Sequence, residues 1–188
     1  PVGARVTLTA GVVDVVRIWD HLKNDLGFHE VGFSPVTSGE MTLFNLNEAE
    51  LAEVFFNMTT LGRRYLEAAL MGENIGFSNM HQMMSDLYEG TSKALPCGAG
   101  VGMLAVDDGG DLHLCHRFSG SGMDTFGSVS DGVDVQGISD FVAARADREG
   151  RDCASCSIRN LCAGGCYHES YARYEDPTQP TLHYCDLM

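Results

Sequence analysis

The sequence predicts a chain of two parts: an α/β part, followed by a small, loop-rich α+β part that is held by cysteines and contains a β-hairpin. Strand, helix and strand patterns follow one another within about 30 residues at the start, which is typical of a βαβ unit with parallel strands. All seven cysteines lie beyond residue 96, where the chain also becomes rich in Gly and Asp. We therefore expect one domain over residues 1–94 and a second over residues 95–188.

The first strand, helix and strand are indicated by periodicity. Residues 5–10 alternate short apolar residues with Thr, as a half-buried strand does. Residues 12–26 carry apolar side chains at helical spacing, and Gly27 provides a helix stop. Residues 29–34 predict a second strand that ends before Pro35.

Two further helices are predicted before the cysteine-rich part. Asn47 and Glu50 have the spacing of a capping box, which opens a long helix to about Gly72. A shorter helix is expected over residues 78–87, closed by Gly90.

The elements expected beyond residue 96 are short. Residues 107–110 read Asp-Asp-Gly-Gly, a strong signal for a hairpin between residues 102–106 and 111–115. A short amphipathic helix is expected over residues 137–148. Little periodicity follows Cys153, which is typical where metal ligation replaces a hydrophobic core.

Composition excludes several classes of protein. Hydrophobic residues make up 44% of the 188 residues, enough for a packed core. The formal charge of −14 repels nucleic-acid phosphate, so no nucleic-acid partner is expected. No apolar run reaches the roughly 18–20 residues that a membrane span needs, and no secretory signal is recognisable. Because an odd number of cysteines fits a closed disulfide framework poorly, we expect a reduced, cytoplasmic protein.

The spacing of the cysteines is the most specific motif in the chain. Thiolates bind soft metals, and four of them complete either a tetrahedral zinc site or a four-iron cluster. Two paired Cys-x2-Cys motifs would favour a zinc ribbon, whereas the wide spacing here suits the larger perimeter of a cubane cluster. The pattern is Cys97-x12-Gly110-x4-Cys115, a gap, Cys153-x2-Cys156-x5-Cys162-x3-Cys166, a second gap, and Cys185.

This order of cysteines resembles the SPASM domain of radical S-adenosylmethionine enzymes. The resemblance implies that residues 1–94 are the last βα units of a partial TIM barrel with linker helices. It also implies that residues 95–188 hold two auxiliary [4Fe–4S] clusters. Carried over position by position, the ligands of the first cluster are Cys97, Cys115 and Cys166, and those of the second are Cys153, Cys156, Cys162 and Cys185.

Seven cysteines leave one of the eight ligand positions open. Some members of the family have an additional cysteine about six residues before the first, where this chain has Thr91. The eighth ligand could be Asp86, Glu89, a substrate thiolate or water, and an open iron could bind substrate directly.

The resemblance also implies the activity. The Cys-x3-Cys-x2-Cys motif, whose cluster cleaves S-adenosylmethionine, is absent here. We therefore expect the chain to be part of a longer protein that carries this third cluster and S-adenosylmethionine upstream of Pro1. The expected partners are a peptide or small protein substrate and a reductant such as flavodoxin or ferredoxin. Residues 6–36 resemble the maturation enzymes of quinohemoprotein amine dehydrogenase, which form thioether crosslinks between Cys and acidic side chains in a small subunit.

Three residues outside the cysteines are candidate site residues. His116 follows Cys115, and it could act as a base, hydrogen-bond a cluster sulfide or serve in packing. Sulfatase-maturing relatives have Asp at this position, so His116 argues against that reaction. Thr9 and Ser34 fall at predicted carboxyl ends of strands, where barrel active sites lie, and are expected to border the S-adenosylmethionine pocket. His113, His168 and His183 are expected to support the clusters or lie at the surface.

Two other functions remain open from the residues alone. One is an iron–sulfur electron-transfer or binding module without radical chemistry, which an upstream sequence lacking Cys-x3-Cys-x2-Cys would establish. The other is a zinc-stabilised interaction domain, which would be colourless, whereas cluster protein would be brown.

Overall fold

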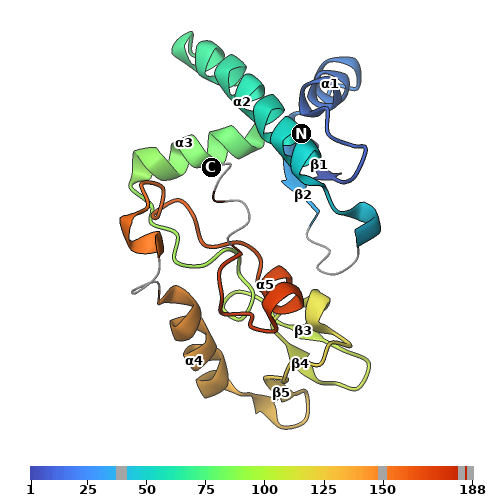
Figure 1. Cartoon of the computed structure of the whole chain (residues 1–188), viewed down its shortest axis with the longest axis vertical. Helices are drawn as coiled ribbons and strands as arrows, with labels where there is room; N and C mark the ends of the chain where they lie inside the picture. The colour runs from blue at the N-terminus through green and yellow to red at the C-terminus, as the bar shows by residue number, and fades with distance from the viewer. Residues whose placement is uncertain (37–41, 148–151, 182–184, 186–188) are drawn as a thin grey trace. The chain divides into compact units, whose positions relative to one another are not determined.

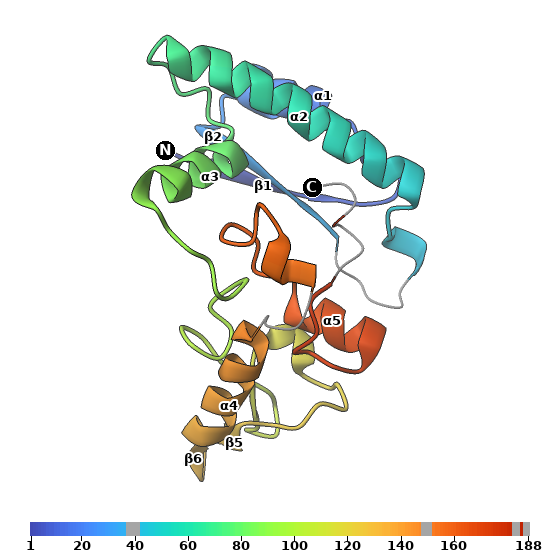
Figure 2. The same cartoon turned by 60° about the vertical axis from the view of Figure 1, so that its left-hand side comes forward.

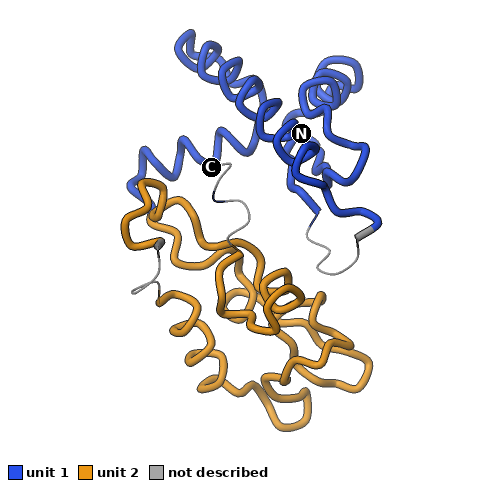
Figure 3. Tube along the Cα trace, in the orientation of Figure 1, with its two compact units in different colours: residues 1–91, 184–188 blue, residues 92–183 orange. Residues whose placement is uncertain are grey.

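The computed structural model of the chain describes residues 1–36, 42–147, 152–181 and 185. The chain divides into two compact units (Figure 3). The first unit comprises residues 1–91 together with 184–188, and the second comprises residues 92–183. The division falls close to the change in composition near Pro96.

The first unit opens with the predicted βαβ arrangement (Figure 1). Strands β1 (Gly3–Leu8) and β2 (Glu30–Pro35) are parallel, with Gly3 opposite Glu30 and Leu8 opposite Pro35. Helix α1 (Val15–Asp20) begins where the Asp14 carboxylate accepts the Arg17 amide at 3.0 Å. The sequence predicted one helix to residue 26, but the last turn (η1, His21–Asp25) is π-helical.

Helix α2 (Glu48–Leu70) follows a short 3₁₀ turn (η2, Thr42–Phe44) and begins at the predicted capping box. Asn47 Oδ1 accepts the Glu50 amide at 2.9 Å, and Glu50 Oε2 accepts the Asn47 amide at 3.0 Å. Glu50 Oε1 also accepts the amide of Gly11 at 2.8 Å. The bond from the Asn47 amide is the main cause that lowers the pKa of Glu50, and the bond from the Gly11 amide lowers it further. The box therefore ties the start of α2 to the loop that follows β1.

We expect Asn47→Ala to lower the free energy of unfolding by about 1 kcal/mol, because an orphan amide at the helix start loses its acceptor. Urea unfolding measures this change, with Glu67→Ala on the exposed face of α2 as the control. The pKa of Glu50 is lower in the folded state, so the stability that its ionised carboxylate contributes is fully present above the ordinary pKa of 4.5. It is lost as the pH falls through the lowered value. Equal urea midpoints for the two variants would contradict the expectation.

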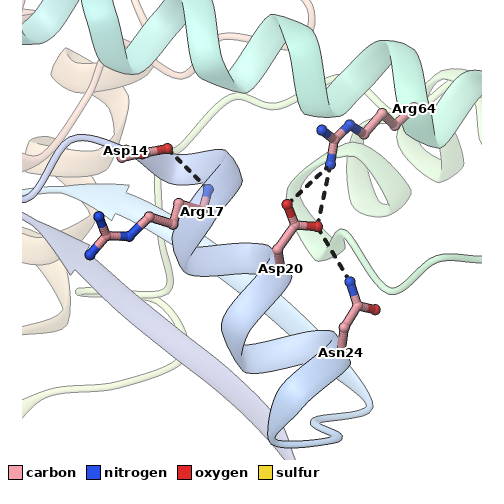
Figure 4. Close-up of polar contacts among 5 residues, drawn as sticks. All are labelled: Asp14, Arg17, Asp20, Asn24 and Arg64. Atoms are coloured by element: carbon pink, nitrogen blue, oxygen red, sulfur yellow. Dashed lines mark hydrogen bonds and ion pairs between the residues drawn. The ribbon is translucent and has the colours of Figure 1, made fainter.

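Helices α1 and α2 lie side by side and pack on the strands (Figure 1, Figure 2). At their surface, Arg64 of α2 bonds to Asp20 of α1 at 3.3 Å, and Asp20 also accepts Asn24 (Figure 4). These groups are solvent-exposed, so the ion pair contributes less than about 1 kcal/mol. The buried apolar side chains carry the stability of this unit. They are Leu8, Val15, Trp19, Val31, Phe33, Val54, Leu61, Tyr65 and Phe77.

Helix α3 (Ser78–Glu89) is joined to β2 by its first turn. The side chain of Asn79 accepts the Phe33 amide at 2.8 Å and donates to the Phe33 carbonyl at 2.9 Å, as a neighbouring strand would. Phe77, just before the helix, forms a β-bridge with Val31. The helix ends at Gly90, whose φ of 68° is the left-handed conformation that the sequence predicted for a helix stop.

The second unit consists of short elements. The predicted hairpin is confirmed and is shorter than expected: β3 (Ala105–Val106) pairs antiparallel with β4 (Leu112–His113). A second small hairpin, β5 (Gly127–Ser128) with β6 (Gly132–Val133), was not predicted. Helix α4 (Val135–Ala146) confirms the expected amphipathic helix within two residues at each end. Helix α5 and two 3₁₀ turns were also not predicted; they are α5 (Tyr167–Tyr174), η3 (His116–Phe118) and η4 (Asp152–Ser155).

A separate hydrophobic core holds the second unit together. The hairpin, α4 and α5 contribute to it, and the half-buried side chain of Cys115 packs against it. Its buried members are Ala99, Leu114, Phe118, Phe126, Phe141 and Tyr167. Within the described ranges, no helix has both the length and the apolar character that crossing a bilayer requires.

Candidate metal centres

Three cysteines of the second unit come from three separate segments. Cys97 precedes a tight turn in which the Gly98 carbonyl accepts the amides of Gly102 and Met103. Cys115 follows β4, and Cys166 caps the start of α5. We call Cys97, Cys115 and Cys166 the first thiol set.

The predicted hairpin determines where Cys115 lies. Asp107 Oδ1 accepts the amides of Gly109 and Asp111, at 3.0 and 2.9 Å, which closes the turn. Asp107 Oδ2 pairs with the buried ring of His113 at 2.9 Å. This hydrogen bond is the main reason that the pKa of Asp107 is lowered. His113 therefore supports the hairpin, two residues before Cys115.

The pKa of Cys115 indicates that the other two thiols of the first thiol set act on it. Burial is the main cause that raises the pKa of Cys115, and the thiols of Cys166 and Cys97 raise it further. Charge interactions weaken with distance, so the sulfurs of Cys97 and Cys166 both lie within electrostatic range of Cys115. Arg117 acts in the opposite direction and favours the Cys115 thiolate. Its guanidinium also donates to the sulfur of Cys166, at 3.6 Å between Nη1 and Sγ.

Two side chains of α5 line the same region. Tyr167 is almost fully buried against Phe141, with ring centroids 5.1 Å apart. Burial first, and then the charges of Cys97 and Cys166, raises the pKa of Tyr167 to about 12. His168 packs edge-on against Phe118, and burial lowers its pKa. Both rings therefore remain uncharged near neutral pH.

We call Cys153, Cys156, Cys162 and Cys185 the second thiol set. Consecutive tight turns connect the first three: the Cys156 amide bonds to the Cys153 carbonyl, and the Cys162 amide bonds to that of Ile158. The Gly164 amide points at the sulfur of Cys162, with 3.4 Å between N and Sγ. Cys185 is exposed and belongs to the first unit.

The donor set fits iron–sulfur ligation, because such clusters are held by thiol sulfurs that receive hydrogen bonds from N–H groups. The Gly164 amide at Cys162 and the Arg117 guanidinium at Cys166 are such donors. Among the described residues, no three His, Cys, Asp or Glu side chains form a group that could hold a single metal ion.

The other predicted site residues are distributed as follows. Thr9 follows β1, and Ser34 lies opposite Thr7 on β2, so both are at the carboxyl end of the parallel pair. Thr9 is half-buried and Ser34 is exposed. His116 lies exposed in η3, and its charge contributes to lowering the pKa of His168. His183 lies outside the described residues.

The two residues considered as eighth ligand, and Thr91 at the position of the additional cysteine, lie in the first unit. Asp86 is buried in α3, where its carboxylate accepts the Gln82 amide at 2.9 Å. Glu89 is exposed at the end of the same helix. The Thr91 amide bonds to the Asp86 carbonyl at 2.8 Å. Their relation to the first thiol set stays a prediction.

Sequence reasoning missed two residues at these centres. Arg117 could have been found as the only Arg or Lys within two residues of Cys115, a predicted ligand at the end of the hairpin. Arg145 gave no such signal, because a lone arginine on a short amphipathic helix predicts a solvated side chain. It is instead 1% exposed.

The fold has a solved counterpart. The structure of native anSMEcpe with bound AdoMet matches 97% of this chain at a TM-score of 0.70 and 14% sequence identity. The chain shares its fold with half of anSMEcpe. It spans 51% of the length of that protein, and the mixed α/β class predicted from sequence is confirmed by the match. No family model and no curated protein matches the chain in sequence.

Proposed function

We propose that this chain is the C-terminal part of a peptide- or protein-modifying radical S-adenosylmethionine enzyme and that it holds two auxiliary [4Fe–4S] clusters. The observation that carries the proposal is the gathering of Cys97, Cys115 and Cys166. The cysteine pattern assigns these three residues to one cluster, and the thiols of Cys97 and Cys166 raise the pKa of Cys115 although the three come from separate segments. The second thiol set would hold the other cluster.

The fold likeness supports the same assignment. anSMEcpe was solved with AdoMet bound, and this chain has the fold of half of it. The Cys-x3-Cys-x2-Cys motif, absent from these residues, would lie in the remaining part of the protein. Thr9 and Ser34, at the carboxyl end of β1 and β2, would border the S-adenosylmethionine pocket. The partners would be a peptide or small protein substrate and a flavodoxin- or ferredoxin-like reductant.

The residues of the second unit have defined tasks in this function. When bound, the auxiliary clusters supply electron transfer or a binding position for substrate. Arg117 favours the Cys115 thiolate and donates a hydrogen bond to the Cys166 sulfur, and thiols must be deprotonated to bind iron. The Gly164 amide stabilises negative charge on the Cys162 sulfur. Exposed His116 would be available to exchange a proton with solvent or substrate.

The finer assignment within this class is a maturation enzyme of the kind that acts on quinohemoprotein amine dehydrogenase. It rests on the sequence likeness of residues 6–36, and it predicts thioether bonds between Cys and acidic side chains of a small subunit. Mass spectrometry of a coexpressed candidate subunit tests it, since each crosslink removes two hydrogen atoms.

Metal analysis tests the cluster assignment directly. Protein purified without oxygen is expected to carry about eight irons and eight sulfides in this part of the chain, from two four-iron clusters. It should be brown, with broad visible absorption. A colourless protein with two zinc ions and no sulfide would contradict the proposal and support the zinc-stabilised domain. Clusters in a protein whose complete sequence lacks Cys-x3-Cys-x2-Cys would instead support an electron-transfer module.

A further inference from the structure

Arg145, near the end of α4, is a buried cation surrounded by backbone oxygens. Its side chain is among the largest that are almost completely buried, at 1% exposure. Nη2 donates to the Gly164 carbonyl at 2.6 Å, to that of Gly165 at 3.0 Å and to that of Ala163 at 3.3 Å. Nη1 donates to the Thr178 carbonyl at 3.0 Å. Burying a guanidinium is costly, so this many acceptors indicate a specific role.

The segment that Arg145 binds is the loop of residues 162–166, which connects the two thiol sets. Its glycines, Gly164 and Gly165, have φ of 77° and 83°, conformations that side chains disfavour. The Gly164 carbonyl also accepts the amide and the hydroxyl of Thr181, at 2.8 and 3.0 Å. The loop therefore turns its carbonyls toward Arg145 and Thr181, while the Gly164 amide is aimed at the Cys162 sulfur.

Arg145 is also close to the other end of this loop. Its guanidinium carbon lies 5.4 Å from the ring centre of Tyr167, directly after Cys166. A permanent positive charge is thus bound to the backbone of the residues that separate Cys162 from Cys166 in the chain.

We propose that Arg145 is a positioning residue for both auxiliary clusters. It holds the 162–166 loop in the conformation that presents Cys162 to one cluster and Cys166 to the other, and its charge offsets their negative charge. This inference rests on the proposed function. A cluster held by thiolates is anionic and becomes more so on reduction, so a nearby cation favours the reduced state. Net charge and hydrogen bonds to sulfur are the factors that set cluster potentials.

Three variants separate the hydrogen bonds from the charge. Arg145→Met removes both, Arg145→Lys keeps the charge with fewer bonds, and Thr181→Val removes one hydroxyl bond to the same carbonyl without changing any charge. Hydrogen exchange of the metal-free protein measures how firmly the loop is held. Iron content and an anaerobic redox titration followed by electron paramagnetic resonance measure the effect on the clusters.

In Arg145→Met, amides 163–165 are expected to exchange at least about tenfold faster, because charged hydrogen bonds are lost. Its clusters should be lost or shift to more negative potentials. Arg145→Lys should show a looser loop with potentials close to those of the parent, and it remains informative if Arg145→Met does not fold. Thr181→Val should loosen the loop with unchanged potentials.

Two results would overturn the inference. If Arg145→Lys exchanged as slowly as the parent, the multiple guanidinium bonds would not hold the loop. If Arg145→Met and Thr181→Val had equal potentials, the charge would not act on the clusters. Failure of the proposed function is recognised separately, from a parent protein that contains no iron or sulfide.

Discussion

The Cys185→Ala variant is expected to lose about four irons and to keep the remaining auxiliary cluster. Cys185 would be the fourth thiolate of the second set, and because it is exposed, its removal would leave a three-thiolate cluster open to solvent. The first thiol set should be unaffected, because its three cysteines and Arg117 all lie in the second unit. Iron and sulfide analysis after anaerobic reconstitution measures the loss.

Cys97→Ala is the matched control for this experiment. Cys97, like Cys185, is an exposed cysteine, but it belongs to the first thiol set. It should lose the other cluster, so the two variants should differ in the electron paramagnetic resonance signal that remains. Unchanged iron in Cys185→Ala, or the same residual signal in both variants, would show that the partition of ligands is wrong.

Gly165→Ala is expected to lower stability strongly for a substitution that adds one carbon atom. Gly165 has a φ of 83°, where a side chain costs about 1–2 kcal/mol. A Cβ added there would also overlap the Thr181 hydroxyl, and overpacking of this kind costs a further 1–3 kcal/mol or so. We expect the free energy of unfolding to fall by about 2–5 kcal/mol, together with loss of iron from both sites.

Gly120→Ala separates the two causes. Gly120 has a similar φ of 77°, but an added Cβ would meet nothing within 4 Å. It should show the backbone cost alone and keep its iron. Combining Gly165→Ala with Thr181→Ala should recover part of the loss, because space is restored. If thermal unfolding were equally affected in the two single variants, overlap with Thr181 would not be the reason that residue 165 is Gly.

The parts of the fold that the sequence predicted are those with local causes. The capping box of Asn47 and Glu50, the helix stop at Gly90 and the turn at residues 107–110 are each determined by residues a few positions apart. The parallel pairing of β1 and β2 followed from the short helical connection between them. The gathering of the first thiol set could be expected only through the family resemblance, since its members lie far apart in the chain.

The parts that could not be predicted depend on tertiary contacts. Helix α5 contains Glu169, which is 1% exposed and pairs with Arg173 at 3.1 Å, so its amphipathic pattern is concealed by a buried charge. The hydrogen-bond acceptors of Arg145 are likewise distant in sequence, since they are carbonyls of residues 18 to 33 positions away. The exposure of His116 depends on how η3 packs, which no neighbouring residue indicates.

The short path from Cys162 to Cys166 has a consequence for the distance between the two proposed clusters. Four residue steps extend at most about 14 Å, whatever the rest of the chain does. If these cysteines serve different clusters, covalent bonds alone limit the separation of the two residues. An electron on one cluster would thus have the other cluster as a nearby acceptor, because the 162–166 segment joins their ligands.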